Sequence, residues 1–197
     1  NLLWGVSNPS AKLPVTFPRN EGQIPIYYNH KHTSHIAKGT EGNLDSVPRE
    51  KPQSVMGHTS SYLDVAPTPL LPFGFGLSYT TFELSNLRVE NPVLSDSEAV
   101  VFYVDVKNTG DREGCEVVQA YVGRKTASTT RPMKELKAYE RVSLKAGESK
   151  TLRLEIPAES LAFCRKDMSW GTEPGNYVLT VGTSSEGGLR SYFKLEK

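Results

Sequence analysis

The side chains best suited to metal chemistry lie near the N-terminus, where His30, His32 and His35 fall within six residues. In an extended chain, residues two positions apart point to the same side, so His30 and His32 would present two imidazoles together. A third imidazole nearby is the kind of ligand that completes a zinc site. However, no Cys, Asp or Glu lies within four residues of the cluster, and the spacing matches no standard zinc motif. We therefore predict a solvated loop here, with no metal and no other cofactor.

Acid–base chemistry needs positioned carboxylates, and residues 40–65 contain four of them: Glu41, Asp45, Glu50 and Asp64. None stands among apolar residues that would raise the pKa of its carboxyl group, so these charges are interpreted as solvated. Ser60 and Ser61 lie near His58, but no nucleophile elbow surrounds them. Residues 74–76 (GFG) lack the Lys-Ser/Thr pair of a phosphate-binding loop and predict a tight turn. The motifs therefore predict no catalytic residue.

Length and charge exclude several classes of protein. The 197 residues are 37% apolar and 23% charged, which suffices for a packed core. Lys and Arg number 23 against 22 Asp and Glu, so the clustered positive charge of a nucleic-acid or membrane-surface binder is not expected. No apolar run reaches the roughly 18 residues that a membrane-spanning helix needs. The chain starts at Asn1 without a signal-peptide pattern, so we expect a signal peptide to be absent or already removed. This start is also compatible with a piece of a longer protein.

Two cysteines, Cys115 and Cys164, are too few for a disulfide scaffold. They lie 164 − 115 = 49 residues apart, with no CxxC motif and no flanking histidine. We interpret them as two unpaired, buried, small apolar residues, since free cysteine is often found in cores. A disulfide between them stays open as the alternative. Two cysteines do not indicate in which cellular compartment the protein works.

The N-terminal part, residues 1–80, holds nine of the thirteen prolines and all four histidines. Residues 12–18 (KLPVTFP) and 24–28 (IPIYY) predict short extended pieces, and their prolines confine them to sheet edges. Residues 29–61 form a polar stretch, which is long for a connection inside a compact domain and is typical of a functional loop or of a missing packing partner. This part therefore needs another surface to pack against.

The C-terminal part, residues 81–197, alternates apolar and polar residues at the period of strands. Strands are predicted at residues 98–107, 114–124, 135–144, 151–156, 175–182 and 190–195. In the first, the pattern places Val100, Phe102, Val104 and Val106 on one face. Short strands separated by Gly and Pro turns predict an antiparallel β-sandwich of the fibronectin III kind. Most aromatic residues fall in this alternation, so they are predicted to lie in or near the core. Trp170 is the one candidate for an exposed aromatic surface on which a sugar ring could stack, but the neighbouring Met168 suggests a packed turn there.

Several segments closely resemble family 3 glycoside hydrolases. Residues 3–18 (LWGVSNPSAKLPVTFP) resemble the end of the second domain of that family, and residues 22–31 (GQIPIYYNHK) continue the match to bacterial β-glucosidases. Residues 62–64 (YLD) and 69–82 (PLLPFGFGLSYTTF) resemble the family's passage into its C-terminal domain. The resemblance continues in the sandwich part, at residues 107–110, 116–122, 134–137 and 173–175. The resemblance covers nearly the whole chain except residues 36–57.

This sequence departs from the family pattern at three positions. Ser61 stands where an Arg usually precedes the Tyr-Leu-Asp triplet, so a sugar or partner contact of that Arg is in doubt. Ala11 replaces a glycine and Cys164 replaces an aromatic residue, which we interpret as packing variation.

The resemblance implies a part of a three-domain enzyme with a (β/α)8-type barrel, an α/β sandwich and a fibronectin III-like domain. Such enzymes are retaining exo-glycosidases that release β-linked glucose or xylose with a nucleophilic Asp and an acid/base Glu. In the family both carboxylates lie upstream of the position of Asn1. Glu41 lies downstream of the family's acid and is rejected as a substitute, so this chain alone is expected to be inactive and to support the upstream barrel and α/β sandwich portion.

The sequence therefore predicts a mainly β fold: a fibronectin III-like, immunoglobulin-like antiparallel β-sandwich at residues 81–197. An extended arm from an incomplete α/β sandwich domain precedes it at residues 1–80. His58, Tyr62 and Asp64 are the predicted substrate-binding residues, on the argument that long loops on rigid scaffolds concentrate binding groups. The predicted substrate of the intact enzyme is a β-glucoside or oligosaccharide.

Several alternatives stay open at the level of sequence. The chain could be a free-standing carbohydrate-binding module, or the same part of a β-xylosidase, and a homodimer is compatible with either. The 80-residue arm favours the enzyme part over the module, because a self-sufficient module has no use for it. By resemblance, a periplasmic or secreted location is favoured over a cytoplasmic one.

Two packing predictions concern the arm. Leu13, Val15 and Phe17 are expected to form an edge strand in a sheet whose other strands belong to upstream sequence. In the linker that follows, Pro69 and Pro72 restrict the backbone, and three aromatic residues are expected to fasten the arm to the sandwich. These are Phe73, Phe75 and Tyr79.

Overall fold

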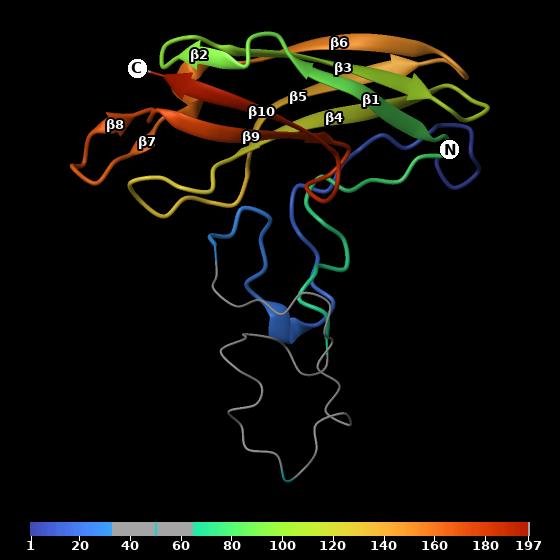
Figure 1. Cartoon of the computed structure of the whole chain (residues 1–197). Coiled ribbons are helices and arrows are strands. Elements are labelled where there is room, and N and C mark those ends of the chain that lie inside the picture. The colour runs from blue at the N-terminus through green and yellow to red at the C-terminus, as the bar shows by residue number, and fades with distance from the viewer. Residues whose placement is uncertain (33–49, 51–64, 197) are drawn as a thin grey trace.

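The computed structural model describes residues 1–32, 50 and 65–196 (Figure 1). Strands in this part of the chain are β1 (Phe82–Val89), β2 (Val93–Ser95), β3 (Val100–Asn108), β4 (Gly114–Gly123), β5 (Glu135–Leu144), β6 (Ser149–Ile156), β7 (Phe163–Cys164), β8 (Trp170–Gly171), β9 (Gly175–Gly182) and β10 (Leu189–Glu196). Two short 3₁₀ helices, η1 (Glu21–Gln23) and η4 (Ala158–Leu161), accompany them. Among the described residues, no helix is long and apolar enough to cross a bilayer.

Two sheets pack face to face in the upper body of the molecule in Figure 1. One sheet has the strand order β1-β3-β6, and the other has the order β2-β10-β9-β4-β5. A small separate pair, β7-β8, extends from one end of the sandwich. This arrangement confirms the predicted mainly β, fibronectin III-like sandwich.

The sandwich forms because alternate residues of its strands are apolar and face the space between the sheets. In β3, Val100, Phe102 and Val104 are fully buried, as the sequence pattern predicted. Their antiparallel partners on β6 are Ile156, Leu154 and Leu152, which are buried as well. β-branched and aromatic side chains fit such a pleated, half-buried surface. The apolar alternation therefore fixes both the strands and the face that enters the core.

The six predicted strands are confirmed, but the sequence pattern missed β1, β2, β7 and β8. Strand β1 carries a bulge between Ser85 and Arg88, where Asn86 has a positive φ of 52°, so its alternation is interrupted. The other three strands have only two or three residues, too few to show a period. Strand β2 also pairs with β10 in parallel, so the sheet is not wholly antiparallel as predicted.

The two cysteines are both free, so the disulfide alternative is wrong. Their predicted burial is wrong for Cys164, which is exposed on β7, while Cys115 on β4 is half-buried. The reason is that β7 belongs to the small two-stranded pair, which has no second sheet packed over it.

The predicted aromatic core is confirmed at Phe102, Tyr121 and Tyr177, which are all buried. The packed turn predicted around Met168 is wrong, because Met168 is 82% exposed and Trp170 is 73% exposed. Met168 occupies a positive φ of 67° at the tip of the β7–β8 hairpin, where no neighbouring layer covers its side chain.

The N-terminal arm, which we define as the described residues 1–32 and 65–80, lies beside one sheet of the sandwich and extends away from it (Figure 1). Residues 12–18 pair with residues 70–75 of the same chain. The sequence had predicted pairing partners in upstream sequence instead. The Leu13 amide donates to the Phe75 carbonyl at 2.8 Å, and the Phe17 amide donates to the Leu71 carbonyl at 2.8 Å. Prolines at positions 14 and 18 have no N–H, so neither residue can donate a backbone hydrogen bond to this pairing.

Candidate functional site

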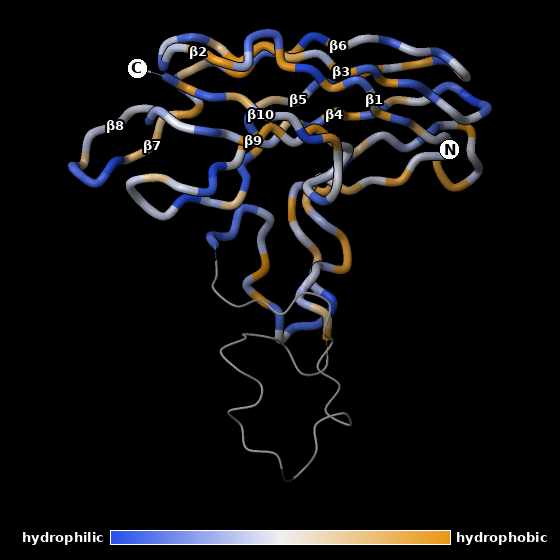
Figure 2. Tube along the Cα trace, in the orientation of Figure 1, coloured by the Kyte–Doolittle hydropathy of each residue, from blue (hydrophilic) through white to orange (hydrophobic). Residues whose placement is uncertain are grey.

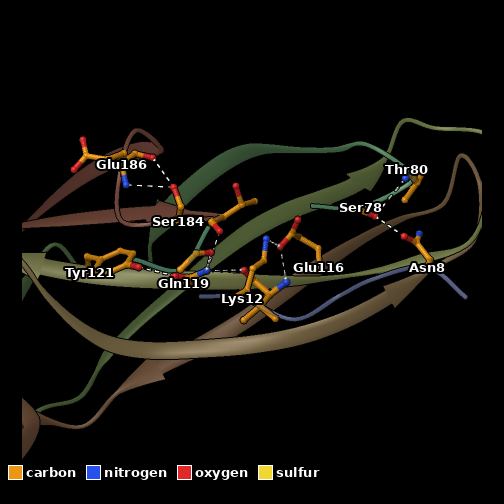
Figure 3. A network of polar contacts seen from close by, with 12 residues as sticks. Asn8, Lys12, Ser78, Thr80, Glu116, Gln119, Tyr121, Ser184 and Glu186 are labelled. Carbon is orange, nitrogen blue, oxygen red and sulfur yellow. Dashed lines mark hydrogen bonds and ion pairs between the residues drawn. The ribbon is translucent and has the colours of Figure 1, made fainter. Parts of the chain in front are cut away.

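The junction between the arm and β4 is the part of the described structure where polar side chains converge (Figure 3). The predicted substrate-binding residues His58, Tyr62 and Asp64 lie outside the described residues, as do Glu41 and His35. His30 and His32 are described and exposed, at the edge of the arm. The junction is therefore the candidate site that the geometry supports.

An ion pair anchors the arm to the start of β4. Lys12 Nζ lies 2.5 Å from Glu116 Oε1, and the two side chains are only 14% and 9% exposed. The same carboxylate oxygen accepts a hydrogen bond of 2.7 Å from the Val117 amide. Figure 3 shows the Lys12 side chain reaching from the arm to Glu116 on the strand. A buried ion pair holds well only when further hydrogen bonds complete its shell, and Glu116 meets that condition.

Gln119, in the middle of β4, ties three segments together. Its Nε2 donates to the Gly74 carbonyl at 3.0 Å and to the Thr183 carbonyl at 2.8 Å. Its Oε1 accepts a hydrogen bond of 2.5 Å from the Tyr121 hydroxyl (Figure 3). Gly74 has a φ of 77°, and a Cβ built there would collide with the Gln119 side chain. The turn predicted at residues 74–76 therefore needs glycine so that the amide can approach the backbone.

An aromatic stack continues the junction. Phe73 stacks on Tyr28, with ring centroids 4.4 Å apart, and Tyr28 meets Tyr121 of β4 edge-on at 5.6 Å. Phe73 reaches β4 through Tyr28, and its carbonyl accepts a hydrogen bond of 2.8 Å from the Ser185 amide, which confirms Phe73 as a fastener between the arm and the sandwich. The other two predicted fasteners act differently. Phe75 is half-buried and pairs through its backbone, while the ring of Tyr79 is exposed and its hydroxyl donates to the Leu2 carbonyl at 2.8 Å.

Asn8 holds the beginning of the arm against the end of the linker. Its Oδ1 accepts hydrogen bonds from the Ser78 hydroxyl at 3.0 Å and the Tyr79 amide at 2.8 Å. Its Nδ2 donates to the Glu113 carbonyl at 3.1 Å, just before β4. Sequence reasoning did not single out Asn8, Lys12, Glu116 or Gln119 by role. The available signal was that all four stand in the segments that carry the family resemblance.

The junction has one strongly perturbed titratable group. Burial raises the pKa of the Tyr121 hydroxyl well above its usual range, and the nearby Tyr28 and Glu186 add to the effect. The hydroxyl is thereby kept neutral as a donor to Gln119. The contacts of the junction, including the pairing of the Glu116 carboxylate with Lys12, hold the arm on β4.

Tyr121 leads to a prediction about alkaline stability. Its folded pKa lies above that of an unfolded tyrosine, so its stabilising contribution is complete below about pH 10 and declines at higher pH, by up to about 1.4 kcal/mol per pH unit. We expect the difference in free energy of unfolding between the native protein and Tyr121→Phe to shrink between pH 9 and pH 11, as measured by urea unfolding. The exposed Tyr139→Phe is the control, and parallel curves for all three proteins would contradict the assignment.

Known proteins resemble this chain throughout. Residues 116–185 match the fibronectin type III-like domain family. The chain is 42% identical over 195 residues to a periplasmic β-glucosidase of Salmonella typhimurium, covering 99% of the chain and 24% of that protein. It is 35% identical over 186 residues to a β-xylosidase of Formosa agariphila, covering 94% of the chain and 23% of that protein.

Solved structures agree with these sequence relatives. The crystal structure of a β-glucosidase from Listeria innocua in complex with glucose matches with a TM-score of 0.85 and 39% identity, over 100% of this chain and 25% of that one. The chain thus spans about a quarter of the length of the relatives that it matches. With the domain match, the predicted resemblance to a C-terminal part of family 3 glycoside hydrolases is confirmed.

Proposed function

We propose that this chain is the C-terminal part of a retaining β-glucosidase that removes terminal β-D-glucosyl residues, and that its own role is to support the catalytic portion. In this proposal residues 1–80 complete an α/β sandwich domain, and residues 81–197 form the fibronectin III-like domain. The observation that carries the proposal is the junction, in which ion pair, amide and aromatic contacts hold the arm on β4. Similarity to β-glucosidases over nearly the whole chain supports it.

The outer surface of the arm supports a role in docking. Leu3 and Trp4 are 93% and 86% exposed, and Figure 2 marks further hydrophobic residues along the arm. The further exposed members are Leu2, Val6, Val15, Phe17, Ile24, Tyr27, Leu70 and Leu77. Each large apolar side chain that becomes buried contributes roughly 1.5–3 kcal/mol, so exposure of this many on one arm favours a permanent partner. The partner proposed is the upstream barrel and α/β sandwich portion of the same enzyme.

The proposal extends to the substrate and to the location of the enzyme. His58, Tyr62 and Asp64 are proposed to line the edge of the sugar site when the upstream portion is in place, since long loops carry binding groups. The name of the Salmonella relative supports a periplasmic or secreted location.

The test is hydrolysis of aryl β-glucosides by this chain alone and by a protein that joins it to the upstream portion. We expect no turnover above the buffer rate from the chain alone, because retaining hydrolysis needs two carboxylates about 5–5.5 Å apart, and the proposal places both upstream. The joined protein is expected to be active. Turnover by the chain alone that survives repurification and disappears in Glu41→Gln would overturn the proposal.

A β-xylosidase is the second candidate, because one relative at 35% identity is a β-xylosidase. The same assay with an aryl β-xyloside distinguishes the two. A higher kcat/KM for the xyloside than for the glucoside in the joined protein would assign the chain to a β-xylosidase.

A further inference from the structure

A groove opens at the end of the sandwich that carries the β7–β8 hairpin. It has a volume of about 540 Å³, within the range of roughly 300–1,000 Å³ that is usual for ligand sites. Side chains from the loop before β5, from β5 itself, from η4 and from the hairpin line it, among them Arg131, Glu135, Lys137, Phe163 and Trp170. The junction between arm and sandwich uses none of these residues.

Trp170 presents a large aromatic surface on a well-held hairpin. The indole is 73% exposed at the groove, although burial of such a side chain is normally favourable. The hairpin is fixed by the Arg165 amide, which donates to the Ser169 carbonyl at 2.8 Å. Asp167 Oδ1 also accepts from the Ser169 amide at 3.0 Å and from its hydroxyl at 2.6 Å. A platform that is already ordered loses little entropy when a ligand packs on it.

The charged groups of the groove balance one another. Arg131 Nη2 lies 2.6 Å from Glu135 Oε2, and Lys137 Nζ lies 3.7 Å from the same oxygen. Glu159 adds a second carboxylate to the lining, so two cations face two anions. The Arg131 guanidinium also lies over the Phe163 ring at 4.1 Å from its centroid. A lining without net charge offers donors and acceptors together, which favours a neutral ligand over an ionic one.

A pyranose ring has the matching chemistry. Its C–H face packs against the electron-rich face of an indole, and its equatorial hydroxyls both donate and accept hydrogen bonds. We propose that this groove binds a neutral oligosaccharide, with one sugar ring stacked on Trp170 and its hydroxyls directed at the Arg131–Glu135–Lys137 cluster. This binding belongs to the chain itself and does not depend on the proposed hydrolytic role.

The test is calorimetric titration of the 197-residue chain with cellotetraose and xylotetraose, with trigalacturonate as an anionic comparison. We expect binding of at least one neutral sugar and at least a tenfold weaker affinity in Trp170→Ala. Trp4→Ala is the matched control, because Trp4 is the only other tryptophan and is exposed on the arm. It should bind as the native chain does.

Location is checked by fluorescence in Trp4→Phe, where Trp170 is the single tryptophan and its emission should change on addition of the bound sugar. Absence of binding by both neutral sugars, equal loss in Trp4→Ala, or tighter binding of trigalacturonate would each overturn the proposal. Circular dichroism confirms that Trp170→Ala is folded. None of these readouts involves hydrolysis, so their failure leaves the proposed function standing.

Discussion

Replacing Gln119 by alanine is expected to lower the free energy of unfolding by about 3–4 kcal/mol, because a buried polar group left without its partner costs about 1–3 kcal/mol. The substitution removes the donor to the Gly74 and Thr183 carbonyls and the acceptor of the Tyr121 hydroxyl. Gln119 and Tyr121 lie at buried positions of β4, where water replaces a lost partner poorly. Urea unfolding followed by circular dichroism measures the change.

Gln23→Ala is the matched control for this prediction. Gln23 is the other glutamine among the buried residues, but its hydrogen bonds go to Arg19, Ala66 and Thr68, all within the arm. Its loss should loosen the arm and leave the unfolding of the sandwich nearly unchanged. Hydrogen exchange at the Gly74 amide should accelerate in Gln119→Ala, because that amide lies at the junction. Equal loss of sandwich stability in both variants would contradict a special role for Gln119.

The second large effect is expected from Lys12→Met, at about 3 kcal/mol, since removing one partner of a buried ion pair leaves the other charge uncompensated. Glu116 is buried and keeps only the Val117 amide as a hydrogen-bond partner among those described for its side chain. The arm should then detach from β4 more readily. Urea unfolding and hydrogen exchange at the Leu13 amide, which pairs with Phe75, report the two consequences.

Lys194→Met provides the matched comparison. Lys194 Nζ lies 2.6 Å from Glu196 Oε1, which is nearly the distance between Lys12 and Glu116, but both side chains of this second pair are half-exposed. An exposed pair contributes about 0–1 kcal/mol, so this variant should change little. The double variant Lys12→Met/Glu116→Leu should recover much of the loss, as an apolar pair needs no compensation. Similar small changes in Lys12→Met and Lys194→Met would show that burial does not strengthen the junction pair.

The sequence alone predicted the strands whose residues alternate over six or more positions. Val100, Phe102 and Val104 were placed correctly on the core face, because the two-residue period of a strand is a property of near neighbours. Phe73 was also identified correctly as a fastener, because it directly follows Pro72, whose restricted backbone lowers the entropy lost when the ring packs. The family resemblance came from contiguous motifs, which the comparisons confirm.

Only the tertiary structure decided the features that depend on segments distant in the chain. Lys12 meets Glu116 and Gln119 meets Gly74 because the arm folds back on β4, and no local period encodes such a pairing. The exposure of Trp170 follows from a hairpin that no second sheet covers, whereas its sequence neighbours suggested burial. His58, Tyr62 and Asp64 stay predictions. Local order is thus determined by the alternation of neighbouring residues, while polar contacts between segments depend on which surfaces the completed fold brings together.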